Sequence, residues 1–354
     1  MKKSLLMIII IFSLFLYVSS IKPNSKSNCQ CYDYPNPLNR NNKVLVPCPI
    51  SKQKKISTSN LADLAVQGSK KNMFDVTFKC GVSDSVLCGA SPARTIPLQD
   101  DDGLVRQYPQ ALVKQFQFQS HPEYGPYDIL AMFNSAGTNF WFDGDGKIKP
   151  DQQDFLYVVL HEIIHGLGFT SNWQDYINEN NPTALTPDIS FIPEGDSKLK
   201  FNGFTESAFD KYIINLSTGH RTSEITNQLN EFAGGVGTEF SSEAQFKSKF
   251  KASPQYSISR NMMKTMITPY SLGFLPHDSN SSTQAVVLET SLCPYEQGSS
   301  VSHVDLNTYN ATSDFLMKYL ADRGATMSAL TELRGCANII GPKLILILET
   351  LGYV

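Results

Sequence analysis

Apolar residues recur with two different periods in the middle of the chain, and each period predicts a different element. Over residues 127–134 they alternate, with Ile129, Ala131 and Phe133 on one side, which is typical of a strand with one buried face. Over residues 151–166 they recur every three to four positions and stop at a glycine, which predicts an amphipathic helix. The pattern therefore predicts a strand followed closely by a helix.

The segments on either side of this pair have a different composition. Residues 21–95 are rich in Ser, Asn, Lys and Pro and hold five of the seven cysteines, which indicates a propeptide or a disulfide-stapled N-terminal region. Residues 171–290 are polar and predict a loop-rich insertion with amphipathic segments around 209–214 and near 244–250. Residues 339–351 predict a second apolar helix. We therefore expect an N-terminal subdomain at 96–170, the insertion, and a C-terminal subdomain at 291–354.

The N-terminus has the pattern of a signal peptide over residues 1–20. Two lysines precede an apolar run at 5–18 and two serines follow it. The run is short of the roughly 20 residues that span a bilayer, so we expect cleavage and no stable membrane span afterwards. Sequons at Asn215, Asn280 and Asn310 fit a secreted or extracellular glycoprotein, and association with the cell surface stays open.

Overall composition excludes two broad classes. Of the 354 residues, 41% are hydrophobic and 18% are charged, which is typical of a globular chain and not of a disordered one. The formal charge is −3, and the only basic run is at 52–55, so nucleic acid is not an expected partner. The oligomeric state does not follow from the sequence.

The number of cysteines is odd, which has a consequence in an oxidising compartment. With seven, at least one thiol stays free or forms an intermolecular bond. From proximity and placement we expect Cys80 to pair with Cys88, and Cys293 with Cys336.

The chemistry of the chain is concentrated in His161, Glu162 and His165 on the predicted helix. Histidines four residues apart lie on one helix face, so both imidazoles can reach a single zinc ion. The glutamate between them is placed to take a proton from a zinc-bound water, whose pKa the ion lowers. The motif therefore predicts a catalytic zinc site with Glu162 as general base.

A catalytic zinc needs a third protein ligand, and the nearby sequence does not supply an obvious one. In short metzincins a glycine three residues after the second histidine turns the chain, and the third histidine follows three residues later. Gly168 occupies the first position, but Ser171 occupies the second and is a poor zinc ligand. The candidates are therefore the four remaining histidines, His121, His220, His277 and His303.

Several separate segments resemble the leishmanolysin-like metzincins, in which an inserted segment precedes the third histidine. The similar segments are the helix and bend at 161–169, the run at 298–303, the turn at 314–317 and the last helix at 339–354. The resemblance implies that His303 is the third zinc ligand. It also implies that Met317 is the Met-turn methionine, which packs beneath the imidazoles without binding the metal. His277, His220 and the absence of a third histidine stay open as alternatives. Precursors of metzincins often place a propeptide cysteine on the zinc, so the resemblance also leaves open that a cysteine before residue 90 binds the metal in a latent precursor.

The resemblance further implies an α+β, metzincin-like zincin fold. A twisted mixed sheet with the active-site helix would be followed by a smaller, irregular C-terminal subdomain that supplies the third histidine. The implied function is a secreted zinc-dependent endopeptidase acting on proteins or peptides, with the substrate extended along residues 128–134. The alternative is a non-catalytic zinc-binding or adhesion glycoprotein on the same scaffold.

Overall fold

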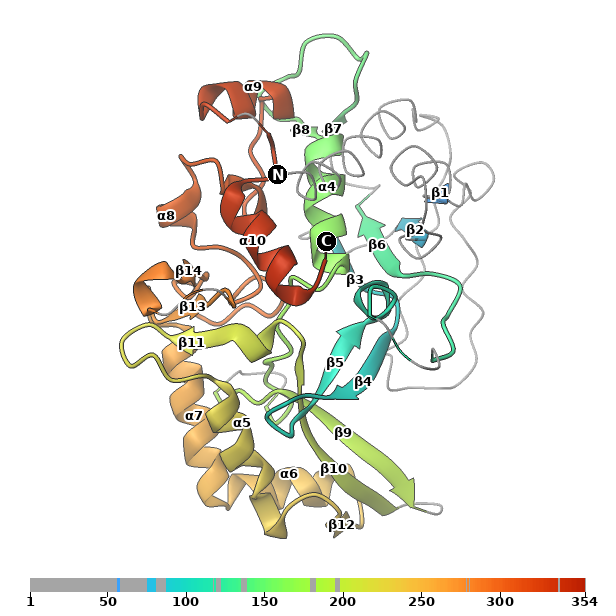
Figure 1. Ribbon diagram of the computed structural model, residues 1–354, viewed down its shortest axis with the longest axis vertical. Coiled ribbons are helices and arrows are strands. Elements are labelled where there is room, and N and C mark those ends of the chain that lie inside the picture. The colour runs from blue at the N-terminus through green and yellow to red at the C-terminus, as the bar shows by residue number, and fades with distance from the viewer. Residues whose placement is uncertain are drawn as a thin grey trace.

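The computed structural model describes residues 87–353, except 117, 119–121, 135–138, 179–182, 195–197, 278, 280 and 337, and the backbone of two earlier strands. Its strands form sheets of four, five, three and two strands with helices beside them, a mixed α+β arrangement (Figure 1). The expected signal peptide, the sequon at Asn280 and the candidate ligand His121 lie outside the described residues.

The four-stranded sheet is built around β6 (Ile129–Phe133), the strand that the alternating pattern predicts. On one side β6 pairs in parallel with β2 (Asp75–Cys80), which in turn pairs with β1 (Ile56–Ser57). On its other side β6 pairs in antiparallel fashion with β3 (Cys88–Pro92), which is the edge of the sheet. Both edges of β6 are therefore occupied by other strands. The expectation that a substrate peptide extends along β6 is wrong.

The positions of β2 and β3 also bear on the expected division of the chain. Both strands lie within residues 21–95, the range that we assigned to an N-terminal region. Their backbone hydrogen bonds nevertheless make them neighbours of β6 in one sheet. Strands from the range 21–95 and from the range 96–170 therefore belong to one sheet.

Helix α4 (Phe155–Gly166) carries the motif and is almost entirely buried. It begins later than the pattern predicts, because Asp154 is its N-cap: one carboxylate oxygen accepts a hydrogen bond from the N–H of Leu156. The other oxygen accepts from the N–H of Met327, which ties the start of α4 to the C-terminal part of the chain. The preceding residues form the short parallel pair β7 (Phe140–Trp141) and β8 (Gln153–Asp154).

Residues 171–290 contain far more regular structure than the loop-rich stretch that we expected, and the amphipathic segment predicted near 244–250 is a helix. The hairpin of β9 (Asp188–Glu194) and β10 (Lys198–Ser207) extends into the lower part of the molecule (Figure 1). It belongs to the five-stranded sheet, whose other members are β4 (Thr95–Gln99), β5 (Val105–Pro109) and β12 (Glu239–Phe240). Beside the hairpin lie α5 (Ser223–Asn230), α6 (Glu243–Lys251) and α7 (Pro254–Met266).

A buried aromatic cluster explains why this stretch folds. Rings from the hairpin and from the following helices lie in edge and tilted contact, with centroids about 5–6 Å apart. The cluster consists of Phe201, Phe204, Phe232, Phe240, Phe246 and Phe250. The polar residues that suggested loops lie on the exposed faces of the same elements, so composition alone concealed the pattern.

The remaining elements complete the C-terminal part. The three-stranded sheet consists of β11 (Ile213–Asn215), β13 (Leu272–Phe274) and β14 (Val286–Val287). The other helices and turns are α3 (Gln110–Val113), η1 (Asp210–Tyr212), η2 (Phe232–Gly234), η3 (Ser282–Gln284), α8 (Leu306–Tyr309), η4 (Phe315–Met317) and α9 (Met327–Leu333). No helix among the described residues is both long and apolar enough to cross a bilayer.

The chain ends with α10 (Pro342–Leu351), as the apolar pattern of the last residues predicts. Gly352 terminates the helix with φ of 118°, a conformation that glycine adopts without steric cost. The hydroxyl of Tyr353 then donates to the carbonyl of Leu167 at 2.8 Å. The end of the chain is thereby attached to the end of α4.

Both expected disulfides are absent. Cys88, Cys293 and Cys336 are free thiols in the described part of the chain. Cys80 and Cys88 are both in register with Phe133, but on opposite sides of β6. Two strand spacings separate their Cα atoms by roughly 9–10 Å, which is beyond the reach of about 7 Å for a disulfide.

The close packing of α4 on β6 leads to a prediction for Gly166. A Cβ added there would lie closer than 3.0 Å to three side-chain carbons of the buried Ile129. Alanine is normally the better helix residue, but this overlap should lower the free energy of unfolding of Gly166→Ala by about 1–3 kcal/mol. Gly89→Ala on β3 is the control, since nothing lies within 4 Å of its added Cβ. Urea unfolding that leaves both variants as stable as the wild type would contradict the prediction.

Candidate metal centre and catalytic glutamate

Helix α4 supplies two of the three histidines of the site. His161 and His165 lie one turn apart on one face, and both are buried. Immediately after the helix, Gly168 adopts φ of 106°, which turns the chain so that the carbonyl of Phe169 returns to His165. The glycine of the predicted bend therefore also fixes the orientation of one imidazole.

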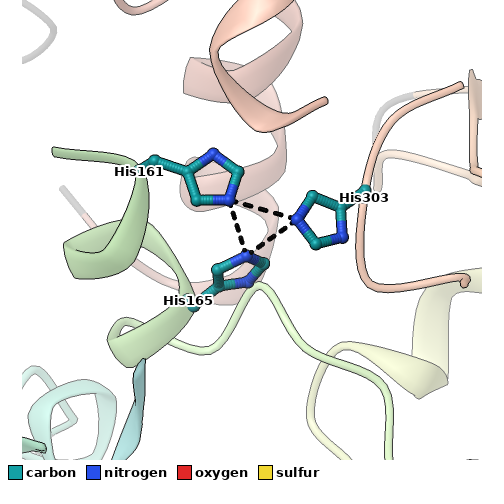
Figure 2. A group of neighbouring side chains, drawn as sticks. All are labelled: His161, His165 and His303. Atoms are coloured by element: carbon teal, nitrogen blue, oxygen red, sulfur yellow. Dashed lines mark hydrogen bonds between the residues drawn. The ribbon is translucent and has the colours of Figure 1, made fainter. Parts of the chain in front are cut away.

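His303 comes from a loop far away in sequence and meets the two helix histidines in space (Figure 2). Its Nε2 lies 3.1 Å from Nε2 of His161 and 3.2 Å from Nε2 of His165. The Nε2 atoms of His161 and His165 are 3.0 Å apart. The three ring nitrogens thus form a compact, nearly equilateral triangle in the interior.

The protonation of these rings follows from their other nitrogens. Each Nδ1 lies against a backbone carbonyl, which can only accept a hydrogen bond, so Nδ1 carries the hydrogen. The carbonyls are those of Leu316 for His161, Phe169 for His165 and Ser299 for His303, at 2.8, 2.7 and 2.9 Å. In neutral rings each Nε2 then carries a lone pair and no hydrogen, and the three lone pairs point at one another.

Burial keeps the rings neutral. It lowers the pKa of His161 to about 3, with His165 adding to the effect, and that of His165 to about 4. It also lowers the pKa of His303, whose ring lies beside the other two. Three neutral imidazoles without hydrogens between them repel one another unless a cation lies between their nitrogens.

The donor set fits a zinc ion. Tetrahedral zinc with Zn–N bonds of about 2.0–2.1 Å places its ligand nitrogens roughly 3.3 Å apart, close to the separations in this triad. Histidines whose Nδ1 donates to a carbonyl are also typical of metal ligands, since that bond orients the ring. The ligand atoms of the three residues all lie within 4.8 Å of one another.

Glu162 lies beside the triad and is 3% exposed. Its Oε1 accepts a hydrogen bond from Sγ of Cys88 on β3 at 2.8 Å. Its Oε2 is buried and has no hydrogen-bond partner among the described residues. Burial raises the pKa of Glu162 to about 7, and a cation nearby would lower it again. One carboxylate oxygen is therefore held in place and the other is free to take a proton.

The turn at η4, which the sequence resemblance identified as a Met-turn, is connected to both sides of the triad. The carbonyl of Leu316 accepts from His161, and the carbonyl of Met317 accepts from the N–H of Val304, next to His303. Met317 itself is buried. The turn therefore holds the helix and the loop of the third histidine together through its backbone.

The loop that carries His303 is held in an unusual conformation. Val301 has φ of 64°, a left-handed conformation that costs a β-branched residue of the order of 1–3 kcal/mol. The N–H of Val301 donates to the carbonyl of Glu289, and the N–H of Glu289 donates to the carbonyl of His303. The N–H of Ser171 donates to Oγ of Ser302. Backbone contacts on both sides of the strained residue thus fix the third histidine.

Glu289 is a residue of this site that the sequence did not indicate. It is fully buried, and its carboxylate accepts hydrogen bonds from the N–H of Ser291 and from the N–H of Leu306 at the start of α8. It thereby joins the segment before the histidine loop to the helix after it. A lone glutamate in an apolar stretch carries no local signal for this role, because only Ser291 is near it in sequence and Leu306 lies 17 positions away.

The other histidines lie elsewhere in the described chain. His220 is exposed and its Nδ1 lies 3.0 Å from the carboxylate of Glu224. Nδ1 of His277 lies 3.1 Å from the hydroxyl of Thr350 on α10. Neither belongs to the group formed by the triad.

Comparison with known proteins gives one family. A family model described as SPBPB7E8-like matches residues 85–354. A relative from Schizosaccharomyces pombe, "Uncharacterized protein PB7E8.01", is 33% identical over 300 residues, which cover 77% of this chain and 51% of the relative. The chain thus spans about half the length of that relative. No solved structure matches the chain. The family match begins just before β3 and includes the triad and Glu162.

The hydrogen bonds that Glu289 makes before and after the loop of His303 lead to a prediction for this residue. In Glu289→Ala the N–H groups of Ser291 and Leu306 lose their acceptor in the interior, so the free energy of unfolding should fall by about 2 kcal/mol or more. Thermal unfolding measures this loss. Glu296→Ala, an exposed residue of the same region, should change stability by less than about 0.5 kcal/mol. Equal unfolding temperatures for the two variants would contradict the assigned role.

Proposed function

The chain belongs to the SPBPB7E8-like family, and we propose that it is a zinc-dependent endopeptidase with a metzincin-like catalytic core. The observation that carries the proposal is that three Nε2 atoms without hydrogens meet next to Glu162, whose Oε2 has no hydrogen-bond partner among the described residues. His161, His165 and His303 would hold the ion. Zinc at this place would lower the pKa of a water molecule and polarise the carbonyl of the peptide bond.

The number of ligands favours a catalytic role over a structural one. Structural zinc sites usually have four protein ligands, often cysteines, whereas catalytic sites have three and leave a position for water. The group found among the described residues has three members, and Cys88 is not one of them. A non-catalytic zinc-binding or adhesion glycoprotein would have no use for a buried carboxylate oxygen without a partner, which costs free energy.

Glu162 performs the proton transfers in this proposal. Its Oε2 would accept a proton from the attacking water and afterwards deliver it to the nitrogen of the leaving amine. Oε1 stays hydrogen-bonded to the thiol of Cys88 throughout, so the carboxylate does not rotate between the two transfers. The fixed geometry removes a reorganisation that would otherwise raise the barrier.

We place the substrate along β3 instead of β6. β3 is the edge strand of its sheet, and its first residue contacts Glu162. An extended peptide can add to a free strand edge through main-chain hydrogen bonds, which would hold its backbone beside the triad. Such binding depends little on side chains, in agreement with a peptidase acting on proteins or peptides.

Metal binding tests the triad directly. Protein stripped with a chelator and dialysed should take up one zinc ion per chain in a calorimetric titration. His161→Ala, His165→Ala and His303→Ala should each weaken binding at least tenfold to a hundredfold, since each removes one of three ligands. His277→Ala is the matched control and should bind as the wild type does. Wild-type affinity in His303→Ala would exclude it as a ligand.

Peptidase activity tests the role of Glu162. The zinc-loaded protein should cleave casein or gelatin, and 1,10-phenanthroline should abolish cleavage. Glu162→Gln should bind zinc as the wild type does but lower kcat by roughly 10²–10⁴-fold, because the proton acceptor is lost. Glu332→Gln on the exposed side of α9 should leave kcat unchanged. A zinc-loaded Glu162→Gln protein that cleaves like the wild type would refute the mechanism, and a wild type without cleavage would favour the non-catalytic alternative.

A further inference from the structure

Cys88 is the only described side chain that donates a hydrogen bond to Glu162. It is the first residue of β3, and its backbone is in register with Phe133 on β6. From there its Sγ reaches 2.8 Å from Oε1 of Glu162 across the interface between sheet and helix. The two residues are 74 positions apart, so this contact arises only in the folded chain.

The surroundings of Cys88 make it a hydrogen-bond donor and not a nucleophile. Burial, together with the neighbouring charge of Glu162, raises the pKa of its thiol strongly, so the thiolate does not form at neutral pH. A thiol has one hydrogen, and here the carboxylate receives it. Cys88 is also outside the group of atoms that can hold a metal. These facts argue against zinc ligation or redox chemistry by this cysteine.

The contact orients the carboxylate. A carboxylate on a flexible side chain can present either oxygen to the triad or turn away from it. Because Oε1 is held by the thiol, Oε2 is the oxygen left without a partner in the interior. Removing the thiol would leave the carboxylate with the backbone N–H of Ala90 as its remaining neighbouring donor among the described residues, and would allow the group to rotate.

We propose that Cys88 is a positioning residue, whose thiol holds Oε1 of Glu162 so that Oε2 faces the reacting water. This inference rests on the proposed function. It assigns the thiol a part in the chemical step, and none in holding the metal or in binding the substrate. The effect of losing the thiol therefore falls on kcat, while KM and zinc affinity stay as they are.

Substitution with a matched control tests the proposal. Cys88→Ala removes the donor and should lower kcat about tenfold to a hundredfold, with KM and the zinc dissociation constant within about twofold of the wild type. Cys88→Ser retains an O–H donor of similar length and should recover kcat to within about threefold of the wild type. Cys336→Ala makes the same change at a half-buried cysteine that donates to a backbone carbonyl, and kcat should not change.

A second measurement needs no activity. In the zinc-free protein the S–H stretching band of Cys88, isolated by subtracting the infrared spectrum of Cys88→Ala, should lie at lower wavenumber than the bands of the other thiols. Glu162→Ala should move it to the position of a free thiol. Wild-type kcat in Cys88→Ala, kcat of Cys88→Ser as low as that of Cys88→Ala, or an S–H band unaffected by Glu162→Ala would each overturn the inference. If the wild type does not cleave peptides, the proposed function fails, and the infrared result still decides whether the thiol holds Glu162.

Discussion

Three backbone carbonyls determine what the buried histidines can bind. The carbonyls of Leu316, Phe169 and Ser299 each take the Nδ1 hydrogen of one imidazole. With the rings neutral, each Nε2 has a lone pair and no hydrogen, and the three lone pairs meet at about 3 Å. Three acceptors gathered in the interior cost free energy unless a cation joins them, which is why we propose a metal ion at this place. The rest of the site can be understood as the scaffold for this arrangement.

Each of those carbonyls comes from a different element, and the fold explains how they reach one place. The close approach of α4 to β6 at Gly166 sets the helix against the sheet. The turn at Gly168 returns a carbonyl to the helix, and η4 supplies another from the C-terminal part. The strained loop at Val301 supplies the third together with the third histidine, and backbone contacts with Glu289 keep that strain in place. Local strain and tight packing thus concentrate where the histidines meet.

The parts of this site that are close together in sequence could be predicted, whereas contacts between residues far apart in sequence could not. Two histidines four residues apart on a helix can be recognised because helix geometry alone brings them together. That His303 approaches these two histidines was predicted from a family resemblance, because no local sequence pattern connects residues 142 and 138 positions apart. The contacts of Cys88 with Glu162 and of Glu289 with the histidine loop had no sequence signal, because tertiary structure creates them. Most of the regular structure in 171–290 could not be predicted for another reason: its buried phenylalanines are spread over several elements and separated by polar residues on the exposed faces of those elements.

A crystal structure of the zinc-loaded protein would show whether the triad holds zinc beside Glu162. Anomalous diffraction measured on both sides of the zinc absorption edge locates the ion without reference to any model of the site. We expect one zinc peak per chain about 2.0–2.1 Å from Nε2 of His161, His165 and His303, with a solvent oxygen as the remaining ligand near Oε2 of Glu162. A zinc ion bound elsewhere, or bound without His303, would contradict it.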